Sequence, residues 1–228
     1  MASLTFSPLT DCRTDMPAKP VDQSRKRLAI RRWIGRAFFL FGVIFLFWIS
    51  NGYRTQGVPK ETLQNSRSVV VLNRAESIEF SPVEPLHKSG LIFFCGSGVA
   101  AEAYAPLLRP LAEDGHRVVI IRLPYRFAPF ESHREIAVDR AREIIRNDRE
   151  TERWVIAGHS LGGALACRLI GPNSPSTIAV ALIGTTHPNR NDFSGIKVPI
   201  TKVYGTYDGI ALRDRIMANK HLLSPETR

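Results

Sequence analysis

The sequence has few of the features that mark several common classes of protein. It contains 3 cysteines in 228 residues, and Cys12, Cys95 and Cys167 show neither a disulfide framework nor the spacing of a metal site. No internal repeat or low-complexity tract is visible, which excludes solenoids and collagen-like chains. The sequence therefore indicates no metal and no organic cofactor. We expect Cys95 and Cys167 to be small buried hydrophobic residues.

An excess of acidic residues is also lacking. The chain has 31 Lys and Arg against 21 Asp and Glu, which gives a net charge of +10. Residues 1–60 hold 10 basic and 3 acidic residues and therefore carry a net charge of +7, which leaves a net charge of +3 for residues 61–228. A basic arm for nucleic acid is one interpretation of the N-terminal segment. The apolar run that follows it favours a membrane instead, and we expect no nucleic-acid partner.

A single long apolar run follows this basic segment. Residues 37–50 carry no charge, and extending the run to 33–53 gives a length that crosses a bilayer. Trp33, Trp48 and Tyr53 lie near its ends, where interfacial aromatic residues belong. Arg36 lies one turn inside, where its side chain can reach the headgroups. A cleaved signal peptide or a buried core helix is the alternative, but the long basic leader favours an uncleaved anchor.

The charge distribution predicts the orientation of this anchor. Five of the six basic residues between Arg25 and Arg36 precede Trp33, which places the N-terminus in the cytoplasm. We therefore expect a single-pass protein of the cell membrane whose folded domain is extracytoplasmic. The expected organisation is a basic cytoplasmic tail, a transmembrane helix, a short tether and a folded domain, at residues 1–32, 33–53, 54–66 and 67–228.

Strand-like and helix-like segments alternate after the tether. Expected strands are 69–72 and 77–80, as a hairpin, then 91–94, 117–122, 154–157, 177–184 and 200–204. Expected helices are 100–113, with Tyr104, Leu107, Leu108 and Leu111 on one face, then 132–147, the segment after Ser160, and 209–222. Continuous apolar strands interleaved with helices predict an α/β fold, with a mostly parallel sheet covered on both faces.

The most informative motif is Gly158-His-Ser160-Leu-Gly162-Gly163, which directly follows the apolar run 154–157. A nucleophile elbow is a tight turn between a strand and the start of a helix, and it exposes a serine hydroxyl. Side chains in place of the flanking glycines would collide with the neighbouring strand and helix. The next backbone N–H, that of Leu161, is free to face a developing oxyanion. We therefore predict that Ser160 is a nucleophile.

Two further positions follow strands, where ligands gather in such sheets. After 91–94 comes a glycine-rich loop in which the Ser97 N–H is the second candidate oxyanion donor. After 200–204 comes Asp208, 48 residues beyond Ser160, in the place of the acid in the order serine, acid, histidine.

The histidine of such a triad has no clear candidate. His221 is only thirteen residues beyond Asp208, where the end of a helix is expected rather than the loop after a further strand. His159 is expected to pack beside the elbow. His187, on the loop after 177–184, is considered as a surrogate base, and Asp192 on the same loop as an alternative acid.

Three segments in this order resemble the α/β-hydrolase superfamily, in particular its dienelactone-hydrolase-like branch known as α/β-hydrolase fold 5. They are Gly96-x-Gly98 with Tyr104-Ala-Pro-Leu, Gly158 to Gly163, and Tyr204-Gly-Thr-Tyr-Asp-Gly209. The resemblance runs from about Gln64 onward and implies a serine hydrolase with Ser160 as nucleophile and Asp208 as acid. Members typically continue into a strand and a histidine-bearing segment that the 228 residues lack, so we expect the domain to be C-terminally incomplete.

The sequence therefore predicts a membrane-anchored serine hydrolase of a small-molecule or lipid acyl substrate, such as an ester or thioester. The alternative is a catalytically impaired binding module, because the histidine is absent. The aromatic segment 124–132 could shape an apolar acyl pocket.

Overall fold

The computed structural model describes residues 23–171, 176–189 and 191–227. The predicted tail 1–22, including Cys12, lies outside the described residues. The chain separates into two compact units, one that ends at Gly52 and one that begins at Tyr53.

The first unit contains one long helix, α1 (Gln23–Gly52). Its segment Lys26–Gly52 is long and apolar enough to cross a membrane, and its most apolar window is not buried in protein. At 1.5 Å per residue these 27 residues span about 40 Å, more than the hydrocarbon core of a bilayer. Phe38 is 78% exposed, which does not fit a core helix. The Arg36 guanidinium lies over the Trp33 ring, 5.8 Å from its centroid.

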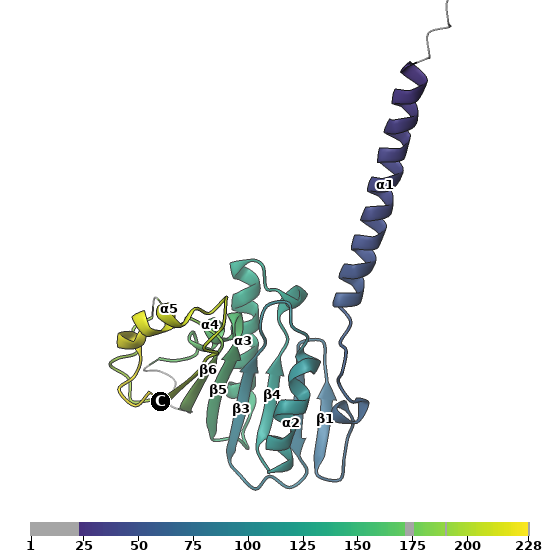
Figure 1. Cartoon of the computed structure of the whole chain (residues 1–228). Helices are drawn as coiled ribbons and strands as arrows, with labels where there is room; N and C mark the ends of the chain where they lie inside the picture. Colours follow the sequence, from purple (N-terminus) through teal and green to yellow (C-terminus); the bar gives the residue numbers. More distant parts are fainter. Residues whose placement is uncertain (1–22, 172–175, 190, 228) are drawn as a thin grey trace, which may run out of the picture. The chain divides into compact units, whose positions relative to one another are not determined.

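The second unit is built on a sheet of seven described strands in the order β1-β2-β4-β3-β5-β6-β7 (Figure 1). The hairpin β1–β2 is antiparallel, β2 is antiparallel to β4, and all other neighbours are parallel. The strands are β1 (Val69–Asn73), β2 (Ser77–Pro82), β3 (Ser89–Phe94), β4 (Arg117–Ile121), β5 (Arg153–His159), β6 (Thr177–Ile183) and β7 (Ile200–Val203). This confirms the predicted α/β fold with a mostly parallel sheet.

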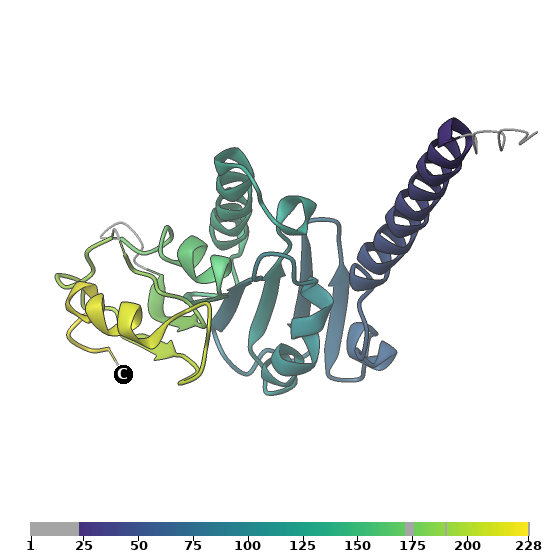
Figure 2. The ribbon, with the colours of Figure 1, turned by 45° about the horizontal axis from the view of Figure 1, so that its top comes forward.

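Helices cover both faces of this sheet. Helix α2 (Ala105–Glu113) lies on one face, and α3 (Glu131–Asn147) with α4 (Leu161–Ala166) lies on the other (Figure 2). The central strands are buried on both sides, and β3 and β4 carry fully buried Ile92 and Ile120. Short 3-10 turns precede β1, at Lys60–Leu63, precede α2 and α3, at Ala101–Tyr104 and Pro124–Arg126, and follow the last helix, at Lys220–Leu222.

The prediction of which residues form the buried apolar face of helix 100–113 is partly wrong. Leu108 is buried, but Leu107 is 67% exposed and Leu111 is 40% exposed. The helix buries Arg109 in their place, and the Arg109 guanidinium donates to the carbonyls of Glu61, Thr62 and Gln64, each at 2.8 Å. The arginine therefore holds the chain that precedes β1 against α2, a role that apolar periodicity does not reveal.

The expected helix 209–222 is also shorter than predicted. Helix α5 begins at Arg213 and ends at Ala218, and the turn Lys220–Leu222 follows it. The preceding residues form a loop because the Asp208 side chain accepts the Ile210 and Ala211 N–H groups, at 2.8 and 2.9 Å. This local turn competes with the start of a helix.

Candidate active site

Ser160 lies in a strained turn between β5 and α4. Its φ of 53° and ψ of −117° lie outside the conformations that L-residues favour, and its N–H donates to the Ile183 carbonyl at 2.9 Å. Such a conformation costs about 1–3 kcal/mol and persists only where the surroundings impose it. The backbone therefore has the sharp turn that the motif predicts.

The glycines of this motif are required by close backbone contacts. A Cβ at Gly158 would lie 2.1 Å from the Gly162 carbonyl oxygen, and one at Gly162 would lie 2.1 Å from the Phe94 carbonyl oxygen. A Cβ at Gly163 would lie 2.6 Å from the Thr185 methyl carbon. Strand β3, the elbow and the loop after β6 thus meet at distances that exclude side chains.

The glycine-rich loop after β3 is held in place by a tyrosine. The Gly96 N–H donates to the Tyr104 hydroxyl at 3.0 Å, and this hydroxyl lies 2.9 Å from His159 Nδ1. Burial raises the pKa of Tyr104 to about 12, so the hydroxyl stays protonated. The Leu161 N–H begins α4 and has no acceptor within that helix. Leu161 follows Ser160 directly, whereas Ser97 lies on the loop that Tyr104 holds.

Asp208 follows β7 on an exposed loop and is itself half-buried. Both described hydrogen bonds of its carboxylate, from the Ile210 and Ala211 N–H groups, end on Oδ1. These two bonds hold the pKa of Asp208 below its usual value, and His159 adds a smaller electrostatic effect in the same direction. The carboxyl group is therefore ionised at neutral pH.

A small cavity of about 160 Å³ opens beside Ser160. The loops after β6 and β7 and the start of α4 form its walls. Its lining residues are Ser160, Leu161, Gly184, Thr185, Thr186, His187, Ile210 and Ala211. Asp208 is not among them, but the two residues that donate to its carboxylate are. Ser97 is not among them either.

His187 is the histidine that lines this cavity. Its Nδ1 lies 3.2 Å from the Thr185 hydroxyl, and its carbonyl accepts a hydrogen bond from Lys202. Burial, and then the positive charges of Lys202 and Arg168, lower the pKa of His187, so the ring is neutral at pH 7. Burial also lowers the pKa of Lys202 to about 8.

The other sequence candidates are not among the residues that line this cavity. His159 packs against Tyr104, as expected. His221 is exposed, with Nδ1 2.9 Å from the Ala218 carbonyl oxygen. Hydrogen bonds from the Ser194 hydroxyl and then from the Ser194 N–H, at 2.9 Å, lower the pKa of Asp192. Within the described ranges, no histidine forms a hydrogen bond with Asp208.

Both buried cysteines are inert in this environment. Cys95 is 1% exposed and Cys167 is 2% exposed, as expected for small hydrophobic residues. Burial raises the pKa of each thiol to about 12. Neither thiol therefore forms a thiolate near the elbow at neutral pH.

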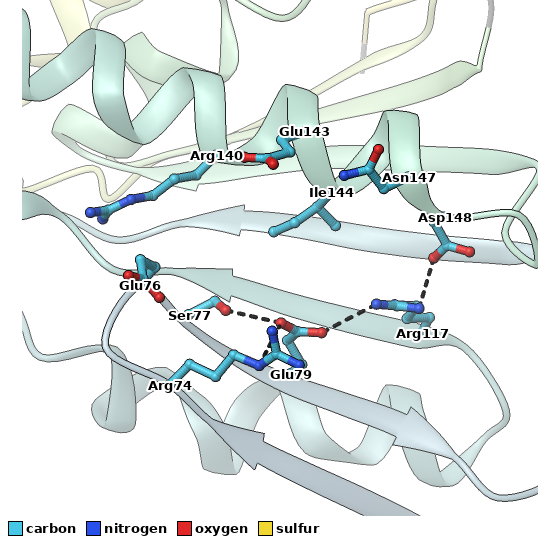
Figure 3. Close-up of a pocket in the computed structure, with 10 residues that line it drawn as sticks. All are labelled: Arg74, Glu76, Ser77, Glu79, Arg117, Arg140, Glu143, Ile144, Asn147 and Asp148. Carbon is cyan, nitrogen blue, oxygen red and sulfur yellow. Dashed lines mark hydrogen bonds and ion pairs between the residues drawn. The ribbon is translucent and has the colours of Figure 1, made fainter.

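A larger cavity, of about 580 Å³, lies away from Ser160, between α3 and strands β2 and β4. Ion pairs dominate its wall: Arg117 contacts Glu79 at 3.2 Å and Asp148 at 2.9 Å (Figure 3). Ser77 also donates to the buried Glu79 carboxylate, at 3.1 Å. These charged groups already pair with one another, so we assign the cavity a structural role.

Comparisons with known proteins agree with this architecture. Residues 90–228 match the model of a family described as the alpha/beta hydrolase family. A solved structure of a predicted CIB-like hydrolase from Thermoplasma acidophilum aligns with a TM-score of 0.56 at 13% identity, covering 70% of this chain and 85% of that one. An alpha/beta hydrolase from a lagoon-sediment metagenome of Mar Chica, Morocco, gives 0.53 at 16% identity, with the same coverage.

A probable hydrolytic enzyme from Pseudomonas aeruginosa aligns with a TM-score of 0.38 at 15% identity, over 51% of this chain. The chain spans only 40% of the length of that protein. None of the curated proteins compared with the chain matches it.

Proposed function

The chain belongs to the alpha/beta hydrolase family, and we propose that it is a membrane-anchored serine hydrolase that cleaves an acyl ester or a similar acyl substrate. The observation that carries this proposal is the strained turn at Ser160, which opens onto a cavity. A serine hydroxyl held at such a turn is accessible to a substrate carbonyl, whereas a purely structural serine needs no such strain.

In the proposed reaction, Ser160 Oγ attacks the acyl carbon and its proton passes to a histidine. The N–H groups of Leu161 and Ser97 donate to the oxyanion of the tetrahedral intermediate. The intermediate collapses to an acyl-serine as the histidine returns the proton to the leaving alcohol. Water then attacks the acyl-serine, and the same histidine removes and returns its proton to release the acid and Ser160.

We assign the histidine role to His187 because it lines the same cavity as Ser160. Its lowered pKa keeps the ring neutral near pH 7, which is the state that accepts a proton. Thr185, which is 4% exposed, holds the ring through Nδ1.

Asp208 has the role of the acid in this proposal. Its ionised carboxylate stabilises the imidazolium that forms when the histidine takes the serine proton. Oδ1 accepts two backbone N–H groups, so the loop geometry fixes the direction of the carboxylate.

The alternative is a binding module that holds an acyl ligand in the cavity without cleaving it. The test is hydrolysis of p-nitrophenyl acyl esters by the full chain in detergent micelles. We expect turnover that Ser160→Ala abolishes and that Ser194→Ala, at an exposed serine, leaves intact. Turnover that is equal in the two variants, or none in the unmodified chain, would favour the binding module.

The proposed membrane placement puts the N-terminus in the cytoplasm and the hydrolase domain outside. Cys95 and Cys167 are buried, so a membrane-impermeant maleimide has Cys12 as its target in the folded chain. We expect labelling only after intact cells are lysed, and none in Cys12→Ser. Equal labelling of intact and lysed cells would show that the N-terminus lies outside the cell, which is the opposite of the proposed orientation. Full extraction of the chain by a high-salt wash would exclude the anchor.

A further inference from the structure

Two histidines and an aspartate meet at the edge of the sheet where the parallel strands begin. His87 lies in the loop before β3, and Asp114 and His116 lie in the turn before β4. One ligand atom from each of the three residues lies within 4.8 Å of the others. We propose that these residues bind a divalent transition-metal ion, with Zn²⁺ as its representative.

The distances within this cluster suit a metal ion better than direct bonds. His116 Nε2 and Asp114 Oδ2 are 3.8 Å apart, which is too long for a hydrogen bond. A tetrahedral zinc ion with bonds of about 2.0–2.1 Å separates its ligands by roughly 3.4 Å. Because His87 and Asp114 are exposed, their side chains are free to turn toward a common ion.

The two imidazole rings are already held together. The rings of His87 and His116 stack with centroids 4.2 Å apart and planes 16° from parallel, so the exposed His87 ring must turn out of this stack before both rings can direct a nitrogen lone pair at one ion. The Ser89 hydroxyl lies 2.9 Å from His116 Nδ1, so it can accept the Nδ1 proton while Nε2 presents its lone pair. Metal-binding histidines typically have such a partner on the second nitrogen, because it fixes the tautomer and the ring direction.

The backbone brings the two segments into contact without the metal. Gly115 has a φ of 93°, and a Cβ there would lie 2.7 Å from the Leu86 Cβ. The loop and the turn therefore pack as closely as a glycine allows, which brings His87 and His116 together. A bound ion would cross-link these segments, a structural role at the edge opposite to Ser160.

The ligand set indicates the class of metal. Imidazole nitrogen favours Zn²⁺, Ni²⁺, Cu²⁺ and Co²⁺, whereas Mg²⁺ and Ca²⁺ prefer oxygen ligands alone. Three protein ligands leave one position of a tetrahedral ion to water. The sequence alone does not reveal this site, because His87 is 27 residues before Asp114 and belongs to no ligand-spacing motif.

The test is calorimetric titration of the full, untagged chain with ZnCl₂ in detergent at pH 7.5, after treatment with a chelator. We expect one ion per chain, with affinity at least about tenfold lower in His87→Ala and in Asp114→Asn. His221→Ala, at an exposed histidine outside the cluster, keeps the full affinity. Absence of zinc binding, or binding that is unchanged in His87→Ala, would overturn the proposal.

A second measurement does not depend on how well the variants fold. Co²⁺ added to the unmodified chain is expected to give visible d–d absorption bands that one equivalent of Zn²⁺ removes and excess Mg²⁺ does not. Absence of Co²⁺ bands, or equal competition by Mg²⁺, would contradict the imidazole ligation.

Discussion

Ser160 and Asp208 both follow parallel strands at the same edge of the sheet, yet the chain holds them in different ways. At the elbow, three glycines lie so close to neighbouring atoms that a Cβ would collide at 2.1–2.6 Å. In the loop that carries Asp208, an added Cβ at Gly205 or Gly209 would meet no such close contact. Two side chains of this loop are largely exposed: Tyr207 fully, and Ile210 to 88%. The nucleophile is therefore positioned by packing of the whole domain, and the acid by its own turn.

The largest effect that tests this difference comes from a glycine of the elbow. Gly162→Ala places a Cβ against the Phe94 carbonyl oxygen, and we expect a loss of about 1–3 kcal/mol in the free energy of unfolding. The ester-hydrolysis activity should disappear as the turn shifts. Gly195→Ala is the matched control, because nothing lies within 4 Å of its added Cβ. Equal stability of the two variants in a urea titration would mean that the elbow is loosely packed.

Removing the charge of the acid tests the other side of the comparison. Asp208→Asn keeps an oxygen for the Ile210 and Ala211 N–H groups, so we expect little change in the melting temperature. The turnover of the ester should fall by roughly 10²–10⁴-fold, because the imidazolium loses its counter-charge. Asp192→Asn, at an exposed carboxylate that also accepts a backbone N–H, serves as the control. If the turnover of the ester falls by less than threefold in Asp208→Asn, Asp208 has no part in the proposed mechanism.

The pH dependence of the stability and of the ester-hydrolysis rate tests whether His187 is neutral at pH 7. Its folded-state pKa lies below the ordinary value of 6.5, so the unfolded chain binds more protons between the two values. The contribution of His187 to stability is therefore present above pH 6.5 and is lost as the pH falls through its folded-state pKa. The Ser160-dependent rate should fall through the same value, about tenfold per pH unit. A rate that declines with an apparent pKa above 7, or a decline that His187→Gln leaves unchanged, would assign the base to another group.

The smallest expected effect concerns Tyr104, which holds the glycine-rich loop after β3 in place. Tyr104→Phe removes the hydroxyl that joins Gly96 to His159, at a cost of about 1 kcal/mol in unfolding free energy. We expect a lower turnover with little change in KM, because the loop acts on the transition state. Tyr125→Phe, at a 76% exposed ring, should change neither quantity. An effect in Tyr125→Phe as large as that in Tyr104→Phe would contradict this role.

The difference between the two regions also explains what the sequence could predict. The strands were predictable because long apolar runs are buried on both faces, and the elbow because its glycines have a steric reason. The hydrogen bond between Tyr104 and His159 was not, since it joins residues 55 positions apart. His187 was named only as a surrogate base, because the sequence does not show that it lines a cavity with Ser160. The exposed Leu107 and Leu111 were assigned to the buried face because periodicity treats every leucine alike, and the same periodicity gives no sign that Arg109 is buried.

The central claim is that Ser160 is an activated nucleophile, and a fluorophosphonate probe tests it most directly. The probe phosphonylates an activated serine and releases fluoride, so it needs no knowledge of the substrate. We expect the full chain in detergent to be labelled at one site, on the peptide that carries Ser160, with labelling lost in Ser160→Ala and kept in Ser194→Ala. Absence of labelling of the folded chain, or labelling that persists in Ser160→Ala, would contradict the claim.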